Sequence, residues 1–302
     1  MNLINIEEAN NKNETDEDIC IGLDFGTTNS VCAVKIGKKT IYLEDKNGKK
    51  LIPSIVLYDG EKKIIGNDAV KEKKFLKSIF SIKRYFNKNP EKKVFLNGQN
   101  INISAIDVAK EIFTYLKYSS ENFLNKELNN CVLTVPAYFD ERARTGIMKA
   151  AFMSGLNVKR LINEPTSAAF AYGLEKNKRG NYFVYDLGGG TFDVSLLKLS
   201  DGIFKVIGTS GDPNLGGDDF DDLFANKLLN NFFNLSMNKL TEEEKLSLIK
   251  KCKFLKERLS KEDEFFEEIK VKDLVKKIKI NQTFFNEAIE NLLDRTIEIS
   301  DN

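Results

Sequence analysis

Short apolar runs broken by turn residues follow a polar first segment. Residues 1–18 are rich in Asn, Glu and Asp and lack the basic-then-apolar order of a signal peptide. Apolar and β-branched runs then alternate with Gly, Asn and Asp, which is typical of strands joined by turns. The pattern predicts consecutive antiparallel strands at residues 19–24, 30–36, 40–43 and 54–58.

Apolar residues recur every three or four positions from Ser104 onward, which predicts a helix with Ser104 as its N-cap. The residues of its apolar face are Ile106, Ala109, Phe113 and Leu116. A strand is expected at 131–135, ending at Pro136. A second helix is expected between Asp140, a favourable N-cap, and Gly155, a favourable stop.

The second half of the chain shows the same alternation of strands and helices. The pattern predicts strands near 158–162, 182–186, 193–199 and 203–209, with helices opening at Pro165, at Asp218 and Asp219, and at the capping box Thr241-x-x-Glu244. The last helix is expected to bury Leu248, Cys252, Leu255 and Leu259. Strands and helices thus alternate twice, which indicates one α/β architecture used twice.

Two hairpins of similar sequence support that duplication. Residues 21–31 read IGLDFGTTNSV, and residues 183–194 read FVYDLGGGTFDV. Each is an apolar strand that ends in Asp, followed by a tight turn of Gly and Thr and a second strand. Internal similarity of this kind indicates a repeated unit, so we expect two lobes that face each other.

The two turns have the composition of phosphate-binding loops. Glycine lets the backbone approach an anion closely, turn amides can point inward, and threonine hydroxyls add donors. The candidate residues are Gly26, Thr27, Thr28 and Asn29 in the first turn and Gly188, Gly189, Gly190 and Thr191 in the second. Asp24 and Asp186 end the strands before the turns, and Mg²⁺ is usually held by one or two carboxylates together with phosphate oxygens and waters. One such hairpin is commonly structural only, but both together predict a phosphate and Mg²⁺ site.

Composition narrows the chemistry. The 302 residues are 41% apolar with a net charge of +1, so neither nucleic acid nor an anionic membrane is expected as partner, and a cytoplasmic location is the default. No apolar stretch approaches the roughly 18 residues of a membrane helix. The chain has no histidine, which excludes His-dependent triads and His-ligated zinc. Its four isolated cysteines are expected to be buried free thiols.

Seven segments in order resemble one known family, the ATPase domain of the DnaK/HscA seventy-kilodalton heat-shock chaperones. They read IGLDFGTTNSV, LIPSIV with IGNDA, IKRYF, LTVPAYFDERAR, RLINEPTSAAFAYG, VYDLGGGTFDVSLL and GDPNLGGDDFD. The leader LINIEEAN and the acidic run after Gly216-Gly217 resemble most the HscA branch, which serves iron–sulfur cluster assembly. The resemblance implies an actin-like ATPase fold of duplicated ribonuclease-H-like lobes, with a polar tail at 1–18, lobe one at 19–178 and an incomplete lobe two at 179–302.

The resemblance also implies roles for individual residues. Lys83 in IKRYF would orient the attacking water and stabilise the γ-phosphate. Glu164 and Asp193 would contact metal-bound waters, Thr191 would lie near the γ-phosphate, and Asp186 would order the metal's hydration shell. The implied ligands are ATP or ADP with Mg²⁺, and K⁺ is a second candidate ion.

Further roles concern nucleotide contacts and regulation. Pro136 and Arg144 resemble the family's proline switch and its arginine partner, and Arg160 matches a position that contacts the J-domain co-chaperone. The implied nucleotide contacts in lobe two are Gly216, Gly217, Lys256 and Ser260. An iron–sulfur scaffold protein would bind through a domain outside this chain.

The chain departs from the family pattern in the helix expected to clamp adenosine. Lys253 stands where the family has glutamate, and Glu257 stands where an arginine stacks on adenine; a carboxylate offers no planar guanidinium face. The sequence ends at Asn302, before the segment that completes lobe two, so we expect weak discrimination between ATP and GTP. We also expect unpaired strand edges near 193–199.

Two other functions remain open at this point. A sugar or acyl kinase could use the same superfold, since fold alone does not fix function. A non-catalytic fragment whose nucleotide site never closes is the third hypothesis.

Overall fold

The computed structural model describes residues 19–72, 74–86, 88–90, 94–95, 102–176 and 179–301. The expected tail at 1–18 lies outside the described residues. The chain divides into two compact units between Pro213 and Asn214, and each unit is described by itself. The boundary comes just after a three-stranded sheet (residues 180–212) that we expected to open lobe two.

The main sheet of the first unit has the strand order β11-β10-β1-β2-β3, with β4 paired to β2. Its strands are β1 (Cys20–Phe25), β2 (Asn29–Ile36), β3 (Lys39–Tyr42), β4 (Ile52–Pro53), β10 (Asn130–Val135) and β11 (Asn157–Asn163). Strand β1 is antiparallel to β2 and parallel to β10. Ile21, Leu23 and Phe25 alternate into the core, as the two-residue period of a strand requires.

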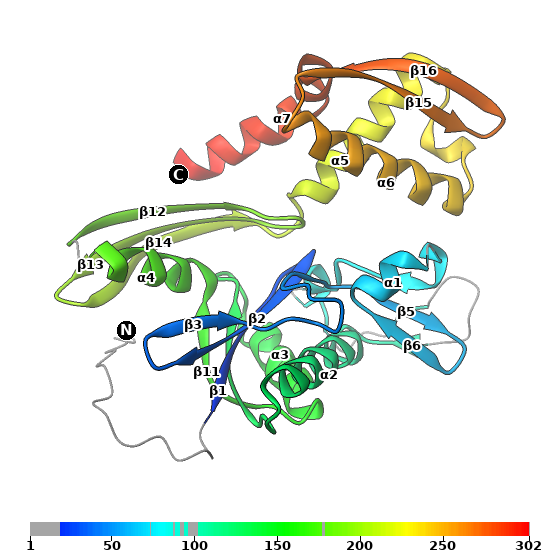
Figure 1. Ribbon diagram of the computed structural model, residues 1–302. Helices are drawn as coiled ribbons and strands as arrows, with labels where there is room; N and C mark the ends of the chain where they lie inside the picture. Colours follow the sequence, from blue (N-terminus) through cyan, green and yellow to red (C-terminus); the bar gives the residue numbers. More distant parts are fainter. Residues whose placement is uncertain are drawn as a thin grey trace. The chain divides into compact units, whose positions relative to one another are not determined.

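Helices α2 (Ala105–Leu124) and α3 (Glu141–Met153) pack side by side (Figure 1). Both N-caps agree with the sequence prediction: the Ser104 side chain accepts from the backbone N–H of Asp107, and the Asp140 side chain accepts from that of Ala143. Gly155 has φ +78° just after α3, a conformation that favours glycine.

A separate sheet corrects one expectation about the fourth strand. We expected residues 54–58 to continue the antiparallel series, but β5 (Val56–Asp59) pairs with β6 (Lys62–Ile65) and β7 (Ser78–Ile79) instead. Pro53 has no backbone N–H to continue the ladder, so the pairing of this segment with β2 ends with β4. The remaining elements here are α1 (Asn67–Lys71), the 3₁₀ helices η1 (Phe75–Lys77) and η2 (Ile82–Tyr85), and the pair β8 (Val94–Phe95) and β9 (Asn102–Ile103).

The last sheet of the first unit contains β12 (Gly180–Leu187), β13 (Phe192–Ser200) and β14 (Ile203–Asp212), in that order. The expectation of unpaired edges at 193–199 is wrong, because β13 is the central strand and pairs on both sides. The sheet contacts α4 (Glu164–Lys176). It also exposes Phe183, Tyr185 and Ile207 to solvent.

The second unit consists of helices and a hairpin. Its elements are α5 (Gly217–Leu228), the π-helical turn η3 (Leu229–Phe233), the 3₁₀ helix η4 (Met237–Lys239), α6 (Glu242–Leu259), β15 (Glu264–Val271), β16 (Leu274–Asn281) and α7 (Gln282–Asp301). The expected face of α6 is buried, and the Thr241–Glu244 capping box forms. The hairpin and α7 were not predicted from the sequence.

The cysteines agree only partly with expectation. All four are free, and Cys32, Cys131 and Cys252 are buried. Cys20 is half-buried instead, because it opens β1 at the end of the sheet. Among the helices of the described residues, none combines the length and apolar character needed to cross a bilayer.

Candidate phosphate and magnesium site

Both repeated hairpins line one cavity of the first unit, with a volume of about 510 Å³. Its lining includes these residues singled out from the sequence: Asp24, Gly26, Thr27, Thr28, Asn29, Lys83, Glu164, Asp186, Gly188, Gly189 and Thr191. Strands β1 and β12 each carry an aspartate to it, and the turn after each strand supplies glycine and threonine. The fold thus brings together residues that are widely separated in sequence.

The two turns touch each other, and glycine is what permits the contact. A Cβ on Gly189 would overlap the Thr28 hydroxyl, and a Cβ on Gly190 would overlap the Thr27 side chain and Arg84. Gly26 is needed within its own turn, where a Cβ would overlap the carbonyl oxygen of Asn29. Each of these three glycines therefore allows a close backbone approach.

The donor groups around the cavity suit a phosphate. Within the described residues, the buried Oγ1 of Thr28 has no hydrogen-bond partner, which is uncommon for a buried hydroxyl. The second turn is closed by the Gly188 N–H, which donates to the Thr191 carbonyl at 2.9 Å. A phosphate oxygen is an acceptor that the Thr28 hydroxyl could satisfy.

The charged groups are arranged around Lys83. Its Nζ donates to Oε1 of Glu164 at 2.6 Å, and only 4% of the Lys83 side chain is exposed. Burial raises the pKa of Glu164, while Lys83 acts in the opposite direction. Burial also raises the pKa of Asp186, with Lys83 opposing and Asp24 adding to the rise.

Asp193 lies behind this group on β13 and is 4% exposed. Burial, reinforced by the Glu164 carboxylate, raises its pKa to about 7, although Lys83 lowers it. Clustered carboxylates of this kind favour a cation between them. The described residues hold no cluster of three or more ligands arranged for a metal ion, so Mg²⁺ would depend on one or two carboxylates plus phosphate oxygens and waters.

The structure adds residues that the sequence analysis missed. Thr134 Oγ1 donates to Asp24 Oδ1 at 2.6 Å, and Arg84 Nε donates to the Gly190 carbonyl at 2.6 Å. Ser167, Ala168 and Ala171 of α4 also line the cavity. The sequence positions of these residues could have drawn attention to them. Arg84 follows Lys83 in IKRYF, and Thr134 lies two residues before Pro136. Ser167 and Ala171 are four residues apart, which places them one helical turn from each other.

Pro136 and Arg144 are in direct contact. Arg144 Nη2 lies 3.4 Å from the Pro136 carbonyl oxygen and 3.3 Å from that of Ala137, and Nε donates to the Phe139 carbonyl at 2.9 Å. Arg144 Nη2 also donates to Asn163 Oδ1 at 2.8 Å. Since Asn163 directly precedes Glu164, this arginine connects the end of β10 to the segment that carries Glu164.

Arg160 is exposed on β11, an edge strand of the main sheet. Its position is thus accessible to a partner, but it does not line the cavity.

Four candidate residues lie in the second unit. Gly216 caps α5, and its N–H donates to Asp219 at 2.8 Å. Lys256 Nζ donates to the Gly217 carbonyl at 2.8 Å and pairs with Asp221 at 2.7 Å. Ser260 is the exposed C-cap of α6. Asp221 is buried and was not among the residues singled out from the sequence. Burial raises its pKa to about 6, although the neighbouring Lys256 opposes the rise.

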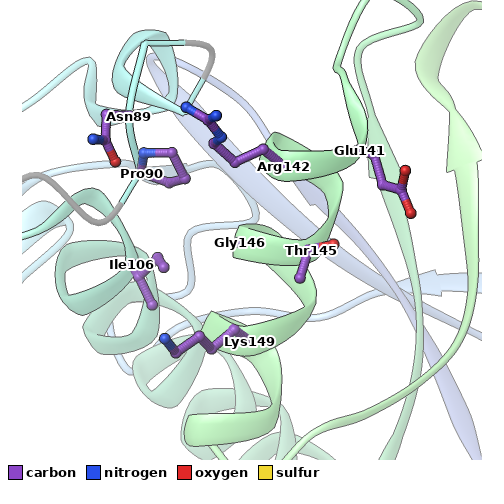
Figure 2. A pocket seen from close by; sticks show the side chains of 8 residues that line it. All are labelled: Asn89, Pro90, Ile106, Glu141, Arg142, Thr145, Gly146 and Lys149. Atoms are coloured by element: carbon purple, nitrogen blue, oxygen red, sulfur yellow. The ribbon is translucent and has the colours of Figure 1, made fainter.

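A second hollow in the first unit has a volume of about 680 Å³ (Figure 2). Pro90 and Ile106 face α3, which contributes Gly146 and Lys149. Glu141 is the only acidic residue of its described lining. Because it has neither a glycine turn nor a carboxylate pair, the larger hollow is not the candidate site.

Comparisons with known proteins agree on one family. A sequence model of the Hsp70 protein family matches residues 20–302. The chain is 37% identical to the chaperone protein HscA homolog of Rickettsia bellii, over 99% of this chain and 50% of the relative. It is 39% identical to the chaperone protein HscA of Buchnera aphidicola subsp. Schizaphis graminum, over 96% and 50%. It is 43% identical to the chaperone protein DnaK of Ureaplasma parvum serovar 3, over 74% and 37%. The chain therefore spans about half the length of the HscA relatives that it matches.

Proposed function

Because the chain belongs to the Hsp70 protein family, we propose that it binds the phosphates of ATP or ADP with Mg²⁺ between its two Gly–Thr turns and hydrolyses ATP. One observation carries this proposal: both turns, both strand-end aspartates and the Lys83–Glu164 pair line the same cavity of about 510 Å³. The relatives of the chain are chaperone proteins, which supports a chaperone ATPase over a kinase or a non-catalytic fragment.

Each charged group around the cavity would have a different role in the proposed reaction. Bound Mg²⁺ would offset the negative charge of the phosphates. Asp24 and Asp186 would hold it through oxygen ligands, with Glu164 and Asp193 acting through waters. Lys83 carries a compact positive charge, suited to the charge that develops on a transferring phosphoryl group. The Thr191 hydroxyl would position the terminal phosphate.

A glycine exchange tests the shared cavity. Gly189→Ala should reduce affinity for Mg²⁺–ADP at least tenfold, since its Cβ would overlap Thr28 where the turns meet. Gly208→Ala is the matched control, because a Cβ on this glycine of β14 meets nothing within 4 Å. Calorimetric titration of both variants, with and without Mg²⁺, measures the difference. No nucleotide binding by the unmodified chain would overturn the proposed function.

The regulatory and partner roles extend the same proposal. The hydrogen bonds of Arg144 to Pro136 and Asn163 support a role for the pair in relaying nucleotide state from Glu164. The exposed Arg160 supports contact with a J-domain co-chaperone. Arg160→Ala should weaken J-domain stimulation of hydrolysis, whereas Arg142→Ala, an exposed arginine on α3, should leave it unchanged.

The remaining expectations also belong to the proposal. Similarity to HscA supports a link to iron–sulfur cluster assembly, with a scaffold protein as partner through a part of the relatives outside the matched region. K⁺ as a second ion, nucleotide contacts from Gly216, Gly217, Lys256 and Ser260, and a cytoplasmic location are proposed with it. The lobe boundaries at 19–178 and 179–302 are likewise proposed as functional divisions.

A further inference from the structure

Segment 51–56, the LIPSIV motif, contributes no residue to the lining of the cavity. Its Ser54 lies between β4 and β5 and is only 2% exposed. Ser54 Oγ donates to the Gly26 carbonyl at 2.8 Å, and the Ser54 N–H donates to the Thr28 carbonyl at 2.8 Å. One residue therefore holds two carbonyl groups of the first Gly–Thr turn.

The hydroxyl protons allow only one arrangement of this network. Ser30 Oγ lies 2.9 Å from Ser54 Oγ, and Ser30 is fully buried. A serine hydroxyl has one proton to donate, and that of Ser54 is given to the Gly26 carbonyl. Ser30 must therefore donate to Ser54, which completes a buried chain from Ser30 through Ser54 to the turn.

This chain determines which way the turn presents its polar groups. A carbonyl oxygen directed at a phosphate would repel it, whereas hydroxyls and amides attract it. The carbonyls of Gly26 and Thr28 are both engaged by Ser54. They are thereby kept away from the cavity, while the Thr28 hydroxyl remains unpartnered there.

We propose that Ser54 is a positioning residue for phosphate binding, holding the carbonyls of Gly26 and Thr28 away from the bound anion. This inference rests on the proposed function, since it assigns Ser54 to the same site. Ser54 acts through the turn and does not line the cavity.

Ser54→Ala in the full chain tests the proposal. Loss of a buried hydrogen bond to the turn should lower affinity for Mg²⁺–ADP and for Mg²⁺–pyrophosphate about tenfold. Affinity for adenosine, which has no phosphate, should stay within twofold. Amide hydrogen exchange at residues 27–29 should become faster in the ligand-free protein.

Ser120→Ala is the matched control. Ser120 is 1% exposed, and its Oγ donates to the Leu116 carbonyl at 2.7 Å within α2. It should lose comparable thermal stability but keep phosphate affinity and the exchange rates of residues 27–29. Ser30→Ala, which leaves the Ser54–Gly26 bond in place, should show a smaller loss of affinity than Ser54→Ala.

Equal losses of ADP and adenosine affinity in Ser54→Ala, or unchanged exchange at residues 27–29, would overturn the role of Ser54. An unmodified chain that binds neither ADP nor pyrophosphate would instead refute the proposed function. In that case the exchange rates alone decide whether Ser54 holds the turn.

Discussion

The ammonium group of Lys83 lies 2.6 Å from a carboxylate oxygen of Glu164, across 81 positions of sequence. Lys83 belongs to η2 and Glu164 is the first residue of α4. The pair is largely buried, so each charge depends on the other for compensation. The consequences of this relationship can be measured separately for catalysis and for stability.

The first prediction concerns hydrolysis. Lys83→Ala should abolish ATP hydrolysis while leaving Mg²⁺–ADP binding within a fewfold of the unmodified chain, because Lys83 acts mainly on the transferring phosphoryl group. Single-turnover hydrolysis and equilibrium titration give the two quantities. Lys88→Ala, at an exposed lysine of the same segment, serves as the control. A Lys83→Ala variant that hydrolyses at the normal rate would refute the assignment.

The second prediction concerns stability. Removing one partner of a buried ion pair commonly costs about 3–5 kcal/mol, because the other charge is left uncompensated. Lys83→Met should therefore lower the free energy of unfolding by about 3 kcal/mol in the absence of nucleotide. The double variant Lys83→Met/Glu164→Gln should recover most of that loss. Urea unfolding of the four proteins forms a double-mutant cycle, and simple additivity would contradict the expected coupling.

The third prediction concerns the metal. Asp24→Asn or Asp186→Asn removes a carboxylate from the cavity lining, so ADP binding should lose most of its stimulation by Mg²⁺. Thr134→Val removes only the hydrogen bond to Asp24 and should have a smaller effect. Calorimetric titrations with Mg²⁺ and with EDTA measure this dependence. Full stimulation in both aspartate variants would argue against a metal between the hairpins.

The fourth prediction concerns pH. Burial raises the pKa of Asp193 from its ordinary value of 3.8 to about 7. Between about pH 4 and pH 7 the folded state therefore retains a proton that the unfolded state has lost. Its contribution to stability is therefore fully present below about pH 4 and is lost as pH rises through 7. The unmodified chain should lose more stability than Asp193→Asn between pH 5.5 and pH 8 in urea unfolding. Equal losses would show that Asp193 does not titrate in this range.

The fifth prediction concerns Arg144. Its guanidinium makes hydrogen bonds to Phe139 and Asn163, and lysine cannot reproduce the planar, forked set of donors. Arg144→Lys should therefore speed amide exchange in residues 136–140 and near Asn163. Arg142→Lys, at an exposed neighbour, should leave exchange unchanged. Mass-spectrometric exchange of the ligand-free chain separates these outcomes.

The sequence predicts local structure well where capping and periodicity act together. Ser104, Asp140 and Thr241 cap helices at the expected places. The two Gly–Thr hairpins, β1–β2 and β12–β13, form as predicted. The mixed α/β class is confirmed, and membership of the Hsp70 family supports the actin-like fold. The β15–β16 hairpin was missed because alternating Glu and Lys on its outer face mask the buried residues Phe265, Ile269 and Ile278.

The site was predictable only as far as motifs carry chemistry in sequence. Asp24, Lys83 and Glu164 stand in recognisable segments, and the structure gathers them around one cavity. Thr134 and Ser54 escaped notice because their contribution is a hydrogen bond to a distant residue. Such pairing depends on strand order, in which β1 lies between β2 and β10, and no local pattern encodes that order.

Helix α4 contacts strands of both the main sheet and the β12–β14 sheet, and its first residue is Glu164. Its side chains therefore pack against strands of both sheets. If one sheet rotated against the other, Asp24 would move with β1 and Asp186 with β12, whereas Glu164 would move with α4. The distances among these three carboxylates would then change with the angle between the sheets, so a ligand that binds all three would favour one angle.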